Sequence, residues 1–152
     1  MQPGHFDAAR AAFDGLYANV HTDESCQLSR AESVRRGMAR SNDSIDLTYG
    51  DATFVCVRDG LAAAAPPAGG TFYDLGSGSG RVVLAAALLF GLELCVGVEI
   101  LADVAAQAAA PARRYAELRE LLRGSKPVDC GLELEPRVLS ALDPARLAPR
   151  VE

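Results

Sequence analysis

The stretch that decides the fold is Phe72-Tyr73-Asp74-Leu75-Gly76-Ser77-Gly78-Ser79-Gly80, which leaves a short β-type run and enters a helical one. Glycine at three alternate positions allows a tight turn and lets a ligand approach the backbone without meeting a Cβ atom. A helix that begins near Ser79 directs free N–H groups and the positive end of its dipole toward that ligand. The stretch therefore predicts a nucleotide-binding turn between a strand and a helix.

The segments around this turn alternate between strand and helix patterns. Strand patterns cover residues 71–73, 93–100 and, more weakly, 132–139, and helix patterns cover residues 79–90 and 102–122. Pro111 lies inside the last helix pattern and predicts a kink or a fresh start there. The alternation predicts an α/β fold with a Rossmann-like parallel sheet of three readable strands, in the order 3-2-1, with helices on both faces.

The residues before this alternation form a helical N-terminal lead. An apolar stripe from Phe6 to Val20 predicts one helix, and Ser29 with Glu32 matches a capping box that opens a second helix reaching Ala39. We therefore expect two parts, residues 1–46 as the helical lead and residues 47–152 as the Rossmann-like domain. The arginines between Arg30 and Arg40 form a solvated helix face or a surface for an acidic partner.

Composition excludes several classes of protein. The net charge of −5 offers no bulk attraction to nucleic acid, so no strong nucleic-acid patch is expected. The chain has no apolar run long enough to span a membrane, and its N-terminus has no secretory signal. Both observations favour a soluble intracellular protein. The cysteines have neither zinc-type nor disulfide-framework spacing, so we predict no metal site and reduced thiols at Cys26, Cys56, Cys95 and Cys130.

The glycine spacing and two acidic residues narrow the ligand. The turn reads G-x-G-x-G, and Arg81 stands where the dinucleotide pattern G-x-G-x-x-G has its third glycine. Asp74 at the end of the first strand suits an ammonium group better than a pyrophosphate, and Glu99 after the second strand can accept hydrogen bonds from ribose hydroxyls. The pattern favours S-adenosylmethionine. A NAD or FAD site, or a tight turn without a ligand, remains open at this point.

Three blocks of the sequence resemble the disruptor-of-telomeric-silencing family, the histone lysine methyltransferases that do not use a SET domain. The blocks are Thr48–Phe54, Asp74–Leu84 and Val96–Glu99. The resemblance implies a class I methyltransferase fold, S-adenosyl-L-methionine as cofactor and methyl transfer to a protein lysine, most plausibly in histone H3. It also implies a histone or nucleosome partner and a nuclear location.

The resemblance assigns roles to particular residues. It puts Tyr49, Gly50 and Asp51 in a loop over the cofactor, although a core aromatic and a helix cap are the plain alternatives for Tyr49 and Asp51. It places Asp74 at the methionine amino group and Glu99 at the ribose. The remaining implied cofactor residues include the turn residues Gly76, Ser77, Gly78 and Gly80, and Ser140 near the adenine. The family usually has a hydroxyl residue where this chain has Ala52, and the neighbouring Thr53 would supply that hydroxyl.

The family's Asn-Phe type motif, which lines the lysine channel, does not occur between Ser140 and Glu152. We therefore interpret the chain as an incomplete catalytic domain, leave its catalytic residues unassigned and expect little methyl transfer by this chain alone. Two alternatives stay open. One is a class I methyltransferase acting on RNA, a small molecule or a non-histone protein, and the other is a non-catalytic cofactor-binding module.

Overall fold

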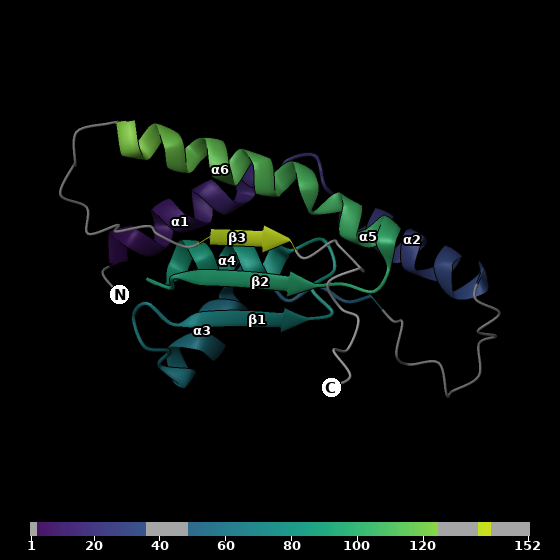
Figure 1. Ribbon diagram of the computed structural model, residues 1–152, viewed down its shortest axis with the longest axis horizontal. Helices are drawn as coiled ribbons and strands as arrows, with labels where there is room; N and C mark the ends of the chain where they lie inside the picture. Colours follow the sequence, from purple (N-terminus) through teal and green to yellow (C-terminus); the bar gives the residue numbers. More distant parts are fainter. Residues whose placement is uncertain (1–2, 36–48, 125–136, 141–152) are drawn as a thin grey trace, which may run out of the picture.

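The computed structural model describes residues 3–35, 49–124 and 137–140, and Figure 1 shows how their elements are arranged. Three helices precede the first strand, and the chain then alternates between strands and helices. In chain order the elements are α1 (Pro3–Leu16), α2 (Thr22–Arg35), α3 (Phe54–Ala64), β1 (Thr71–Leu75), α4 (Arg81–Leu89), β2 (Leu94–Val98), α5 (Ala102–Gln107), α6 (Ala109–Gly124) and β3 (Arg137–Ser140).

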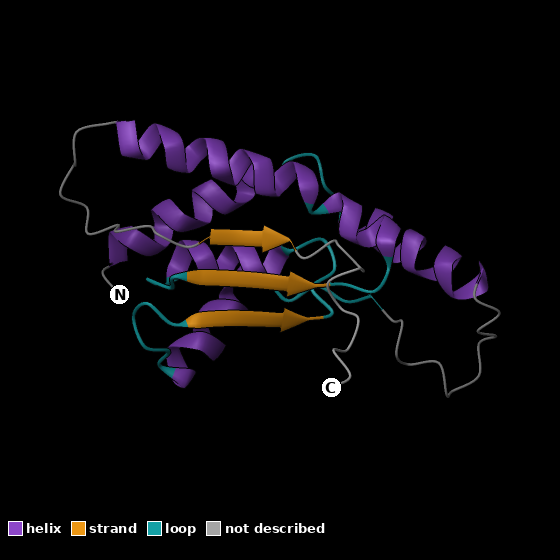
Figure 2. Cartoon of the chain, in the orientation of Figure 1, coloured by secondary structure: helices purple, strands orange, loops and turns teal. Residues whose placement is uncertain are grey.

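The strands form a parallel sheet in the order β1-β2-β3, with β2 in the middle. The central strand is a nearly continuous apolar run, and its Cys95 is completely buried, as suits a strand between two neighbours. The register pairs Asp74 with Gly97 and Gly97 with Ser140. All three arrows in Figure 2 point the same way, so the carboxyl ends of the strands lie together. The predicted parallel α/β alternation is confirmed, while residues 132–136 of the third predicted strand lie outside the described residues.

Helix α4 is the centre of the hydrophobic core. It packs against all three strands on one face of the sheet and against α1 and α3 on its other side. Its sequence consists of good helix formers, and Ala85, Ala86 and Ala87 have no exposed surface at all. The helix begins at Arg81 and not at the predicted Ser79, because Gly80 takes the left-handed conformation, with φ 80°, at the N-cap position.

The N-terminal helices pack onto this core through aromatic rings. Phe13 of α1 contacts Phe54 of α3, with the ring centroids 4.9 Å apart. The predicted start of α2 at Ser29 is wrong, since the helix already begins at Thr22 and Ser29 lies inside it. Asp23 and Glu24 in the first turn favour the earlier start, because they face the positive end of the helix dipole. The expected extension to Ala39 lies outside the described residues.

The predicted fresh start near Pro111 is confirmed. Ala108 separates α5 from α6, and Pro111 lies in the first turn of α6, where a missing backbone N–H costs nothing. Arg35 of α2 forms an ion pair with Asp103 of α5, and the Ser25 hydroxyl donates to the Gln107 side chain. These contacts hold α2 against α5, beside the carboxyl ends of the strands.

One face of β1 is exposed. Tyr73 and Leu75 alternate with inward-facing residues, and 61% and 79% of their surfaces are accessible. The expectation that helices cover both faces of the sheet is therefore wrong along β1 in the described part of the chain. No helix among the described residues is long and apolar enough to cross a membrane.

Candidate functional site

The glycine turn crosses over the end of β2. The amides of Gly76 and Ser77 both donate to the carbonyl oxygen of Val98, at 2.7 and 3.0 Å. Gly76, Gly78 and Gly80 have φ angles of +87°, +56° and +80°, a region in which side chains are strained. A Cβ atom on Gly76 would meet no atom of the described residues within 4 Å, so the described part of the chain leaves space beside the turn for a ligand. The turn predicted from sequence is confirmed as a structural feature.

A glycine in β2 makes room for this turn. A Cβ atom on Gly97 would lie 2.7 Å from Oγ of Ser77 and 3.0 Å from a methyl carbon of Val83. The Ser77 side chain therefore packs against the backbone of the central strand. This contact explains why the apolar run of β2 is interrupted by glycine.

Two carboxylates flank the turn at the ends of β1 and β2. Glu99 accepts hydrogen bonds from the amides of Gly78 and Leu101, each at 2.8 Å, so it ties β2 to the glycine turn. Burial raises the pKa of Asp74, and the negative charge of Glu99 raises it further. The strand ends thus form a negative site that a positively charged ligand group would neutralise.

The loop before α3 lies on the glycine turn. The ring of Tyr49 is so close to Gly78 that a Cβ atom there would come within 2.5 Å of Cε2. The Tyr49 hydroxyl contacts the Asp51 carboxylate and lies 3.0 Å from Oγ of Ser79. Burial and the hydrogen bond to Asp51 raise the pKa of Tyr49. The hydroxyl therefore stays protonated and donates a hydrogen bond to the Asp51 carboxylate. The structure thus brings Tyr49 and Asp51 to the turn, and their predicted place over a cofactor stays a prediction.

Asp51 is also held by a cation from α4. Nε of Arg81 lies 3.0 Å from Oδ2 of Asp51, and only 17% of each side chain is exposed. The Thr22 hydroxyl at the start of α2 donates to the same carboxylate. Asp51 is therefore not the cap of α3. That role belongs to Thr53, whose hydroxyl accepts from the amide of Cys56 at 3.2 Å.

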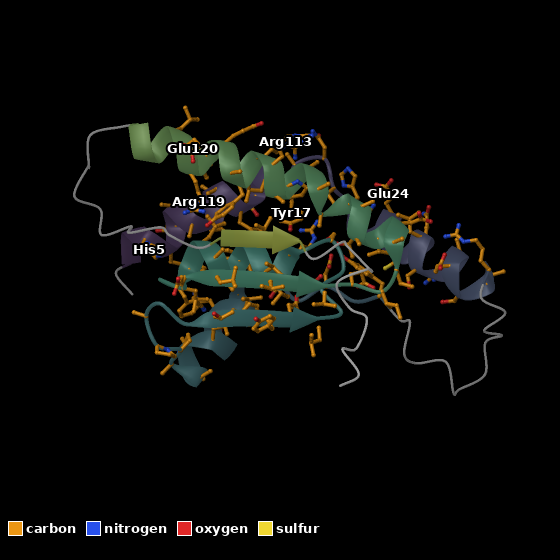
Figure 3. The ribbon with its side chains drawn as sticks, in the orientation of Figure 1. His5, Tyr17, Glu24, Arg113, Arg119 and Glu120 are labelled. Atoms are coloured by element: carbon orange, nitrogen blue, oxygen red, sulfur yellow. The ribbon has the colours of Figure 1, made fainter. Side chains whose placement is uncertain are left out.

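The other end of this arrangement is α1. The Arg81 guanidinium lies 4.4 Å from the centre of the Tyr17 ring and donates to the Val20 carbonyl at 2.7 Å. The Tyr17 hydroxyl donates a hydrogen bond to the Ser79 carbonyl at 3.1 Å. Figure 3 labels Tyr17. Sequence reasoning missed these contacts, because it used Arg81 only as an obstacle to a dinucleotide and Tyr17 only as part of an apolar stripe.

The remaining predicted site residues are Gly50, Thr53, Gly80 and Ser140, and their surroundings differ. Gly50 is exposed beside Tyr49, and Thr53 is exposed at the helix cap. A Cβ atom on Gly80 would lie 3.3 Å from Cβ of Ala108. Ser140 ends β3 beside Gly97, and its side chain lies outside the described residues.

In the part of the chain that the structure describes, neither surface charge nor metal ligands indicate a second site. Exposed residues of α6 carry both signs: Arg113 and Glu120 lie on its surface, as Figure 3 shows, and Glu117 is also exposed. Of the predicted arginine cluster, Arg35 pairs with Glu32 and Asp103, and Arg36 and Arg40 lie outside the described residues. Among the described residues no group of three or more His, Cys, Asp or Glu side chains could hold a metal ion.

A parallel sheet with a glycine turn and an acidic residue at the end of each of its first two strands is the arrangement of Rossmann-like α/β proteins. The family model of the histone methylation protein DOT1 matches residues 34–135, which is more than half of the chain, and the chain belongs to this family. The family has the class I methyltransferase fold, and its members are histone methyltransferases. A search of curated proteins found no match.

Proposed function

We propose that the chain binds S-adenosyl-L-methionine at the carboxyl ends of β1 and β2. We further propose that it takes part in methylating a lysine of histone H3 in the nucleus. The observation that carries the proposal is the pairing of two carboxylates with an open glycine turn. Asp74 has a raised pKa beside Glu99, and the space at Gly76 is free. A ligand with one ammonium group and one ribose matches this arrangement.

Each predicted cofactor residue has a role in this proposal. Asp74 pairs with the methionine ammonium group, and Glu99 accepts from the ribose hydroxyls while it keeps its bonds to Gly78 and Leu101. The Tyr49-Gly50-Asp51 loop covers the cofactor, and Thr53 supplies a hydroxyl near it. Ser77 and Gly80 shape the turn, and Ser140 lies near the adenine.

The residues present fit the cofactor because, among the described residues, the space beside Gly76 is open, while the Tyr49 ring closes the side of the turn at Gly78. When bound, S-adenosylmethionine supplies an electrophilic methyl group. Transfer to an amine depends on alignment and on removal of water more than on covalent help from the protein. A lysine with an ordinary pKa near about 10.4 must also lose a proton, and no residue is assigned to that step.

Titration calorimetry with S-adenosylmethionine, its demethylated product and NAD tests the cofactor. We expect both sulfur ligands to bind and NAD to bind more weakly, since a pyrophosphate would meet Asp74. Tighter binding of NAD would overturn the proposal. Radiolabelled transfer to nucleosomes, free histones and RNA then tests the acceptor, and labelling of RNA alone would contradict the histone assignment.

The two-part organisation also stays a proposal, with residues 1–46 as a helical lead and residues 47–152 as the cofactor-binding domain. The aromatic contacts of α1 with α3 support a lead that is docked on the domain. Expression of residues 47–152 alone tests it: a folded fragment, even one with weakened affinity for the cofactor, supports a separate lead, and a fragment that does not fold contradicts it.

A further inference from the structure

Arg81 is the residue through which three separate segments meet at the glycine turn. It occupies the first position of α4, directly after Gly80. Its guanidinium pairs with Asp51 in the loop before α3 and donates to the Val20 carbonyl beyond α1. Only 17% of the side chain is exposed, so solvent screens these contacts less than it would on the surface.

The contacts on the far side of Arg81 fix its position. The Tyr17 ring lies under the guanidinium, and the Tyr17 hydroxyl bonds to the Ser79 carbonyl inside the turn. A planar guanidinium can stack on a ring and pair with a carboxylate at the same time, which a lysine ammonium cannot reproduce. The segment directly after α1 therefore determines where Arg81 holds Asp51.

The loop side of the contact reaches the ligand space. Asp51 receives the Tyr49 hydroxyl as well as Arg81, and the Tyr49 ring rests on Gly78. If Asp51 moves, the Tyr49 hydroxyl loses its charged hydrogen-bond acceptor and keeps only neutral partners such as Oγ of Ser79. The position of the loop over the turn thus depends on a cation that does not itself reach the open space at Gly76.

We propose that Arg81 is a positioning residue that holds the Tyr49–Asp51 loop on the glycine turn, and that the segment directly after α1, through Tyr17 and Val20, controls the affinity of the site for its cofactor. This inference rests on the proposed cofactor site. It adds that this segment is an energetic part of that site, because any shift of the segment moves Arg81 and releases Asp51.

Substitution of Arg81 by glutamine tests the inference, with Arg58→Gln as the matched control. Arg58 also forms an ion pair, with Asp59, and also stacks on an α1 ring, that of Phe6, but it lies away from the turn. We expect Arg81→Gln to weaken binding of the demethylated cofactor about tenfold, the usual size of coupling between linked sites, and Arg58→Gln to leave it unchanged. Equal affinity of wild type and Arg81→Gln would overturn the inference.

A double-mutant cycle separates positioning from general loss of structure. Asp51→Asn and the double variant with Arg81→Gln are titrated with the same ligand. If Arg81 acts through Asp51, its substitution has little further effect in the Asp51→Asn background, whereas a general structural loss adds in full. Additive losses would overturn the inference. Failure of the wild type to bind would instead refute the cofactor site itself.

Hydrogen exchange gives a second measurement that needs no ligand. In Arg81→Gln we expect faster exchange at the amides of residues 49–53, with unchanged protection at the centres of β2 and α4. Arg81→Lys should fall between the two, since it keeps the charge and loses the stacking on Tyr17. Unchanged exchange at residues 49–53 would show that the loop does not depend on Arg81.

Discussion

The ring of Tyr49 occupies the place that a side chain at Gly78 would need: a Cβ atom there would lie 2.5 Å from Cε2 of the tyrosine. The two residues are far apart in the sequence, on the loop before α3 and in the turn after β1. Their contact closes one side of the glycine turn and leaves the side at Gly76 open. The first prediction follows from this contact.

Gly78→Ala should displace Tyr49 and lower affinity for the demethylated cofactor by more than about tenfold, a loss of about 1.4 kcal/mol. The positive φ of Gly78 adds a backbone strain of about 1–2 kcal/mol. Calorimetric titration measures the affinity, and far-UV circular dichroism checks the fold. Gly60→Ala is the control, because Gly60 lies in α3 with nothing within 4 Å and should gain up to about 1 kcal/mol of stability. Binding that survives in Gly78→Ala would contradict the proposed site.

Asp74→Asn should lower the affinity for the cofactor and stabilise the ligand-free protein. The folded-state pKa of Asp74 is raised, so its contribution to stability falls as the pH rises from its ordinary pKa through the raised one, and asparagine removes this loss. Thermal melting over a pH series measures it.

The pH dependence of binding has the opposite sign. An ammonium ligand needs the ionised carboxylate, so affinity should decrease as the pH falls below the raised pKa of Asp74, and the decrease should be smaller in Asp74→Asn. Glu99 is the charged neighbour whose negative charge helps to raise the pKa of Asp74. An identical pH profile in the two proteins would exclude Asp74 from the ligand contact.

Glu99→Ala should reduce affinity by about 1.5–3 kcal/mol, the contribution of hydrogen bonds to a charged group. The variant should also melt at a lower temperature, because the amides of Gly78 and Leu101 lose their acceptor. Titration with S-adenosylmethionine separates the two effects, with exposed Glu93→Ala as the control. A lower melting temperature with full affinity would assign Glu99 a structural role alone.

Cys95 should resist thiol reagents in the native protein. It is completely buried, and burial raises its pKa to about 12, so the reactive thiolate is scarce. Cys56 is exposed and should react at once. Variants that keep only one of these two cysteines, labelled with a maleimide and followed by mass spectrometry, give both rates. Rapid labelling of Cys95 without denaturant would show that the core opens far more easily than its packing indicates.

The fold was predictable where local chemistry and packing agree. The apolar run of β2 and the glycine turn were read correctly, since a buried parallel strand and left-handed glycines leave direct marks in the sequence. The start of α2 was misplaced, because Ser29 with Glu32 satisfies a capping pattern that the helix beginning at Thr22 does not use. A cap pattern cannot tell a helix start from a helix interior on its own.

The candidate site was predictable only as far as it is local. The turn and Glu99 follow from spacing along one strand-helix-strand unit. The contacts of Arg81 with Asp51, Val20 and Tyr17 join segments that only the tertiary fold brings together, so no spacing rule could find them. Asp51 looked equally suited to a helix cap, and only the geometry gives that role to Thr53.

The burial of α4 has a consequence for the order in which the chain is made. Leu16 ends α1, and its partner helix does not begin until Arg81, 65 residues later. At about 5–20 residues per second, a ribosome needs roughly 3–15 s to cover that gap. During that time the apolar face of α1 can contact α3, through Phe13 and Phe54, but it lacks the larger part of the core that α4 supplies. Until α4 is synthesised, the incompletely covered face of α1 therefore presents a binding site for chaperones.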